Sequence, residues 1–200
     1  MILPQRIQLK FFFTQDSKID LHSIIPVFHR WIQTHAVDGL LIDVANYAHV
    51  PEGPGVLLVG HEVDYAIDLS EGRVGLLHTR KISRTAGGQT FAEQLQTAIE
   101  SALQARDVLA QEASLDVTFV PDEIELRIVD RLVAVNSAET FATLQADITT
   151  AFTNTIGNVQ LAYVPRDRRR PLTIHVKLNR REREERRENK RDSIISTFWP

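Results

Sequence analysis

Between positions 43 and 68, seven polar side chains stand on an otherwise apolar stretch: Asp43, His49, Glu52, His61, Glu62, Asp64 and Asp68. Imidazole and carboxylate groups act as general acids and bases, so His49, Glu52, His61 and Glu62 are the candidate catalytic residues. No nucleophile elbow, HExxH or Walker signature accompanies them. Histidines held by structural hydrogen bonds explain the same positions, so the stretch names neither a reaction nor a cofactor.

The second candidate in this stretch is a metal site. Glu62, Asp64 and Asp68 share one face of a strand, because alternate residues of a strand point the same way. Three carboxylates on one face are a candidate Mg²⁺ or Ca²⁺ site where a facing loop adds oxygens. The alternative is a solvated strand face, which shows the same alternation. His61 points away from Glu62, so these neighbours do not share one metal ion without a bulge.

The elements that position these residues follow from hydrophobic periodicity. Period-two or short apolar runs predict strands over residues 5–14, 40–44, 56–60, 63–69, 74–81, 117–120, 123–129, 159–164 and 172–178. Helical spacing predicts three helices, which begin at Ser23, Thr90 and Asn136 and end near residues 35, 113 and 157. Thr90 with Glu93 and Asn136 with Glu139 fit capping boxes. The predicted fold class is α+β, an antiparallel or mixed sheet covered by three helices.

The domain prediction separates a body from an extension. Residues 1–179 are expected to form a single α+β domain, with a possible division into two halves near Ser114. Residues 180–200 are expected to form a charged helix followed by an apolar C-terminal hook.

Charge sets this extension apart from the body. Residues 166–200 carry twelve Lys or Arg and six Asp or Glu, a net charge of +6, whereas residues 1–165 carry −9. Aromatic and aliphatic side chains at the end of a chain are stabilised by docking in a groove. The predicted partner-binding residues are Arg180, Arg181, Arg186, Arg187, Ile194, Ile195, Phe198 and Trp199.

Three functions remain open from these patterns. The favoured one is a non-enzymatic interaction or assembly module, which docks its extension on a protein partner or on another copy of itself in a homo-oligomer. The first alternative is an enzyme or metal-binding protein built on the His and Glu residues above. The second is nucleic-acid binding through the arginines, which the interleaved acidic residues weaken.

The chain contains no cysteine, which excludes disulfides and thiolate metal sites and favours a reducing compartment. No signal-peptide pattern or stretch of about twenty apolar residues appears, so a cytoplasmic protein with no membrane span is expected.

Residues 41–68 read LIDVANYAHVPEGPGVLLVGHEVDYAID. This stretch resembles a block in a group of small uncharacterised bacterial proteins. The resemblance implies a bacterial domain and carries no activity, ligand or site with it.

Overall fold

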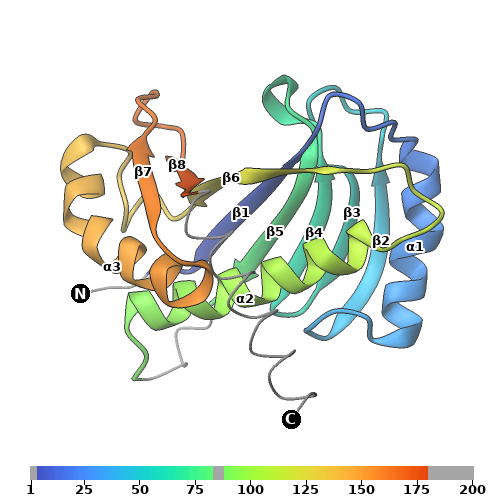
Figure 1. Cartoon of the computed structure of the whole chain (residues 1–200), viewed down its shortest axis with the longest axis horizontal. Helices are drawn as coiled ribbons and strands as arrows, with labels where there is room; N and C mark the ends of the chain where they lie inside the picture. The colour runs from blue at the N-terminus through green and yellow to red at the C-terminus, as the bar shows by residue number, and fades with distance from the viewer. Residues whose placement is uncertain (1–3, 83–87, 180–200) are drawn as a thin grey trace, which may run out of the picture.

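The computed structural model describes residues 4–82 and 88–179, which form one eight-stranded sheet and three α-helices (Figure 1). This is the α+β class that the sequence predicts. In chain order the elements are β1 Arg6–Phe13, α1 Leu21–Thr34, β2 Leu41–Tyr47, β3 Gly55–Gly60, β4 Val63–Asp68, the 3₁₀ turn η1 Ser70–Gly72, β5 Gly75–Lys81, α2 Phe91–Ala110, β6 Phe119–Ile128, α3 Ala138–Ile156, β7 Val159–Tyr163 and β8 Leu172–Leu178.

The first strand of the chain lies in the middle of the sheet. The strand order is β2-β3-β4-β5-β1-β6-β8-β7, and every neighbouring pair is antiparallel. β1 therefore joins the four strands before α2 to the three strands after it. The segments on either side of Ser114 contribute to one continuous sheet, whose edge strands are β2 and β7.

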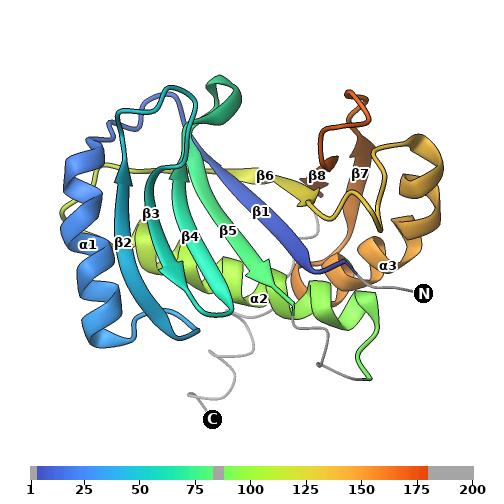
Figure 2. The ribbon, with the colours of Figure 1, turned by 180° about the vertical axis from the view of Figure 1, so that it is seen from behind.

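The helices and the hydrophobic core lie on one face of this sheet. In Figure 1 α2 runs across the strands in front of them, and in the reverse view of Figure 2 β2–β5 and β1 lie in front of α2. Ile7, Leu9 and Phe11 alternate along β1 toward the helices. One core cluster packs between α2, α3 and the strands around β6, and the other packs under α1, where Trp31 is fully buried.

Two helix starts differ from the prediction by a few residues, because neighbouring side chains compete to cap the same turn. α1 is capped by Asp20, whose carboxylate accepts from the His22 N–H, whereas Ser23 lies inside the first turn. α3 is capped by Ser137, which accepts from the Thr140 N–H, and not by Asn136.

The predicted capping box of α2 is confirmed. The Thr90 hydroxyl accepts from the Glu93 N–H, and the Glu93 carboxylate accepts from the Thr90 N–H. The helix end predicted near residue 157 is also confirmed, since Gly157 caps α3 with a φ of 101°.

The two strands predicted on either side of Pro121 are one strand, β6. Its pairing with β1 is irregular at this point, since Phe11 lies opposite Ile124 while Phe13 lies opposite Phe119. A bulge of this kind accommodates a proline, because the residues within it stand outside the regular ladder of hydrogen bonds. The proline therefore bends the pairing without ending the strand.

None of the described helices combines the length and the apolarity that crossing a membrane requires.

Candidate functional site

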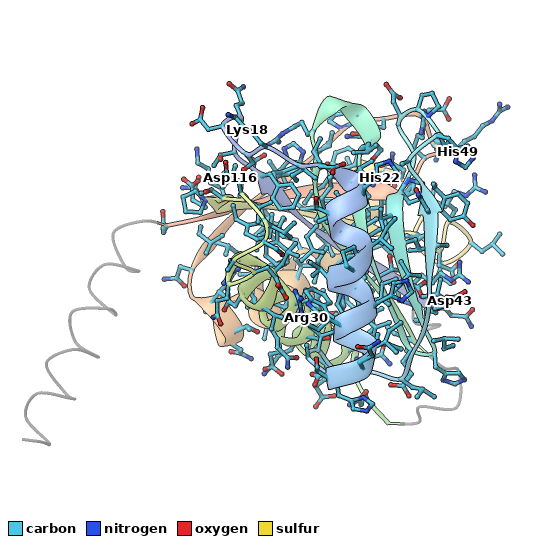
Figure 3. All side chains as sticks on the ribbon, turned by 90° about the vertical axis from the view of Figure 1, so that its right-hand side faces the viewer. Lys18, His22, Arg30, Asp43, His49 and Asp116 are labelled. Atoms are coloured by element: carbon cyan, nitrogen blue, oxygen red, sulfur yellow. The ribbon has the colours of Figure 1, made fainter. Side chains whose placement is uncertain are left out.

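The four candidate catalytic residues lie at opposite ends of β3. His49 and Glu52 belong to the loop between β2 and β3, whereas His61 and Glu62 form the turn between β3 and β4. Figure 3 shows His49 near one end of the sheet, well beyond Asp43 on β2. Because β3 has six residues, at about 3.3 Å each, the two turns lie on the order of 20 Å apart. The structure does not bring His49 and His61 into one site.

Two of the three candidate metal ligands, Asp64 and Asp68, are already paired with other groups. The Asp64 carboxylate lies 2.7 Å from the Lys81 ammonium and accepts from the Gly60 N–H at 3.0 Å. Asp68 accepts from the Lys10 ammonium at 2.7 Å and from the Ser70 hydroxyl at 2.6 Å. Within the described ranges no group of three or more His, Asp or Glu side chains is placed to hold a metal ion.

A further assembly of charged groups contains only one residue, Asp68, to which the sequence pattern pointed. We call it the charged sheet face, and it lies opposite the helices: Lys10, Asp68, Glu123, Glu125, Arg127 and His175. The register explains why it forms there. Ala66, Leu77, Lys10, Glu125 and His175 stand side by side across five strands, each next to its cross-strand partner.

Burial distinguishes this face from a solvated one. Lys10 is fully buried, and Asp68 and Glu125 are 5 % and 3 % exposed. Each buried charge has an opposite charge beside it: Lys10 has Asp68, and Glu125 has the Arg127 guanidinium at 2.5 Å. Buried ions are tolerated in this way because the partner replaces part of the lost hydration.

Burial also shifts the titration of Lys10. Loss of hydration lowers the pKa of its ammonium group, and the hydrogen bond to Asp68 opposes that shift. A lysine with a lowered pKa is a common nucleophile or general base in enzymes. Here its ammonium is hydrogen-bonded to Asp68 and to the Ser70 carbonyl oxygen, at 2.7 and 3.2 Å, in a position closed to solvent.

Two arginines close the rim of this face. The Arg73 guanidinium lies 3.5 Å from the centroid of the Phe12 ring and donates two hydrogen bonds to the Glu123 carboxylate. These hydrogen bonds lower the pKa of Glu123. Arg166 pairs in the same way with Glu71, and that pairing lowers the pKa of the Glu71 carboxyl. The basic groups of the face are therefore occupied by its own carboxylates.

A second buried polar group lies under α2. His78 is fully buried, its Nε2 is 3.2 Å from the Ser101 hydroxyl, and its ring packs edge-on against Tyr65. Burial lowers the pKa of His78 to about 3, so the imidazole is neutral at physiological pH. A serine beside a histidine is the arrangement of a nucleophile with its base. Ser101 is only 4 % exposed, so a substrate has no path to it.

His61 and Glu62 do line a pocket, together with residues that the sequence did not connect to them. This pocket of about 270 Å³ lies between the β3–β4 turn, the end of β5 and the first turns of α2, with Arg80, Lys81, Gln94 and Thr97 in its wall. Neither His49 nor Glu52 contributes to it.

The predicted partner-binding residues, from Arg180 to Trp199, lie outside the described residues. The predicted charged helix and apolar hook of residues 180–200 lie outside them as well.

Comparison with known proteins adds no assignment. No protein-family model, curated protein or solved structure matches this chain.

Proposed function

We propose that the protein is a non-enzymatic interaction or assembly module, which docks residues 180–200 on a protein partner or on another copy of itself. The extension combines seven basic residues between Arg180 and Arg191 with Ile194, Ile195, Phe198 and Trp199. Aromatic anchors supply affinity at protein interfaces, and arginines supply orientation. The proposal includes a cytoplasmic location.

The observation that carries this proposal is an apolar edge on the described body. Leu40, directly before the edge strand β2, is 66 % exposed, and on β2 itself Ile42 is 58 % exposed and Tyr47 is 40 % exposed. A strand at the end of a sheet uses one side of its backbone for pairing, so its other side is available to a further chain. Apolar side chains beside such an edge are a recurring feature of docking surfaces.

We assign this edge to the C-terminal apolar residues of another copy of the chain. Asp43, which is exposed on β2 between Ile42 and Val44, offers a negative charge to the basic part of the extension. Figure 3 shows Asp43 projecting from β2 on the side away from α1. The acidic charge of residues 1–165 and the basic charge of the extension are complementary as a whole.

The test compares the full chain with a chain that ends at Arg191. Light scattering after size exclusion gives the mass of each, and circular dichroism reports whether the body stays folded. We expect the full chain to assemble and the shortened chain to be monomeric with an unchanged spectrum. An identical mass for the two chains contradicts docking on another copy of the chain.

A second comparison tests the assigned edge. Ile42→Lys places a charge on the edge of β2, which opposes strand addition and apolar docking. The matched control is Leu132→Lys, because Leu132 is 97 % exposed and lies between β6 and α3. Ile42→Lys is expected to dissociate the assembly, whereas Leu132→Lys leaves it intact. If the two variants assemble equally well, β2 is excluded from the interface, whereas the role of the extension is not.

Two of the described arginines give the nucleic-acid alternative no support. Arg73 and Arg166 each hold a carboxylate, on Glu123 and Glu71 respectively. Phosphate binding requires basic groups that are free to replace counterions. A further test measures nucleic-acid binding at low and at high salt. The interaction module is expected to show no specific binding, whereas binding that weakens steeply as salt is raised is what the nucleic-acid alternative expects.

A further inference from the structure

The pocket beside the first turns of α2 gathers charged and polar side chains, independently of the proposed docking function. Its volume of about 270 Å³ is just below the range of roughly 300–1,000 Å³ for ligand pockets, which suits a small metabolite. Three separate elements form its wall, namely the β3–β4 turn, the end of β5 and α2. It therefore lies where strand ends and a helix meet.

Among the described residues, one positive and one negative group in this wall have no ion-pair partner. Lys81 is held by Asp64 and by the Gly60 carbonyl oxygen, both at 2.7 Å. Within residues 4–82 and 88–179, by contrast, no carboxylate lies within 4.0 Å of Arg80 and no basic group lies within that distance of Glu62. The two charges thus face the same space without neutralising each other.

A third group in the wall is buried and incompletely bonded. Gln94 is 4 % exposed, and its side-chain oxygen has no hydrogen-bond donor among the described residues. Buried amide oxygens are nearly always paired, because leaving one unpaired costs the hydration it has lost. A donor on a bound molecule would remove that cost.

From these three groups we propose that the pocket binds a small zwitterion of the α-amino-acid class. The ligand carboxylate pairs with the Arg80 guanidinium, which is suited to bidentate contact with a carboxylate. The ligand ammonium pairs with Glu62, and it donates to the Gln94 side-chain oxygen once that side chain, whose oxygen is covered in the free protein, turns toward the pocket. A simple anion is disfavoured by Glu62 and a simple cation by Arg80, so the combination selects a molecule that carries both charges.

The experiment measures binding of individual L-α-amino acids to the full chain by ligand-observed NMR at millimolar concentration. Acetate and methylamine serve as probes of each charge alone. We expect at least one amino acid to bind, and acetate and methylamine to bind at least tenfold more weakly, because each makes only part of the charge-assisted contacts. Arg80→Gln and Glu62→Gln are each expected to weaken binding of the amino acid by roughly tenfold or more.

Arg30→Gln is the matched control, because Arg30 lies on α1 and pairs with Glu112 far along the chain from the pocket wall. It is expected to bind the amino acid as the unaltered chain does. Thermal unfolding of each variant checks that the body is folded. Arg80→Lys is a second variant at this position, which keeps the positive charge but loses the bidentate geometry of arginine. Absence of binding by every amino acid overturns the proposal. Equal affinity for acetate, or affinity unchanged by Arg80→Gln and Glu62→Gln, overturns it as well.

Discussion

The ammonium group of Lys10 on β1 lies 2.7 Å from the carboxylate of Asp68 on β4, and β5 runs between these two strands. Gly75 of β5 stands directly opposite Asp68, so no side chain rises from β5 at that position. Both charges are almost completely buried. The pair therefore links two strands that are not hydrogen-bonded to each other, on the face away from the helices.

Removing one member of this pair is expected to be costly. Lys10→Met or Asp68→Asn leaves the other charge buried with incomplete compensation, and we expect either change to lower the free energy of unfolding by about 3–5 kcal/mol. The double variant Lys10→Met/Asp68→Asn removes both charges and is expected to lose much less free energy of unfolding than the sum of the two single changes. Urea unfolding of the four proteins measures the coupling.

The control for this cycle is the Lys81–Asp64 pair, whose side chains are 28 % and 20 % exposed. Solvent screens such a pair, so Asp64→Asn is expected to cost only about 1 kcal/mol. If Lys10→Met proves as mild as Asp64→Asn, the buried pair does not contribute as its geometry implies.

His78 gives a prediction about pH. Its pKa in the folded protein is about 3, against an ordinary value of 6.5, because burial disfavours the charged imidazole. Between these two values the unfolded chain binds a proton that the folded chain does not, so stability falls as the pH falls through this window. Between pH 6.5 and 5 the loss is expected to reach roughly 2 kcal/mol.

This interval is the informative one, because the carboxyl groups with lowered pKa values, Glu71, Glu93 and Glu123, stay ionised throughout it. His78→Gln keeps a polar partner for Ser101 but has no group that titrates, so its stability is expected to be flat from pH 6.5 to 5. His29→Gln, at an exposed position of α1, keeps the slope of the unaltered protein. A slope that survives His78→Gln would assign the acid sensitivity to another group.

Sequence periodicity was sufficient for most of the fold because each element carries its own signal. The alternation of Ile7, Leu9 and Phe11 gives β1, and the capping box at Thr90 gives α2. The strand order cannot be predicted in this way, because no local pattern indicates that β1 lies between β5 and β6. Pro121 misled the strand assignment because a bulge, which the sequence does not reveal, accommodates it.

The charged sheet face and the pocket depend even more on contacts that no local sequence pattern predicts. Lys10 and Arg127 alternate with apolar residues, which is the pattern of a solvated strand face, yet pairing across the sheet buries Lys10 with Asp68. The pocket joins Glu62 to Arg80 and Gln94, and Gln94 lies 32 positions further along the chain than Glu62. Contacts of this separation follow from topology, so residues 43–68 alone pointed to His61 and Glu62 but not to their partners.

The start of α3 offers a test of which neighbour caps the helix. Ser137→Ala removes the acceptor for the Thr140 N–H and is expected to cost about 1 kcal/mol. Asn136 is buried and donates to the Asp167 carbonyl oxygen instead, so Asn136→Ala is expected to loosen the contact between α3 and the β7–β8 loop. Hydrogen exchange separates the two effects, with faster exchange in the first turn of α3 only for Ser137→Ala. The opposite pattern would make Asn136 the cap.

Gly60 is required for the close approach of two backbone segments at the turn beside the pocket. A Cβ atom at this position would lie 2.2 Å from the Val63 carbonyl oxygen and 3.1 Å from that of Leu40. Because backbone atoms do not move aside as a flexible side chain does, Gly60→Ala is expected to cost about 3 kcal/mol.

Gly72 is the matched comparison, since a Cβ atom there meets nothing within 4 Å although its φ is +67°. Gly72→Ala is expected to cost only about 1 kcal/mol, from the left-handed backbone alone. Asparagine tolerates that conformation better than alanine, so Gly72→Asn should recover part of the loss, whereas Gly60→Asn should not. Chemical unfolding of the four variants distinguishes the two causes, and a recovery at Gly60 as large as at Gly72 would show that conformation rather than space limits both turns.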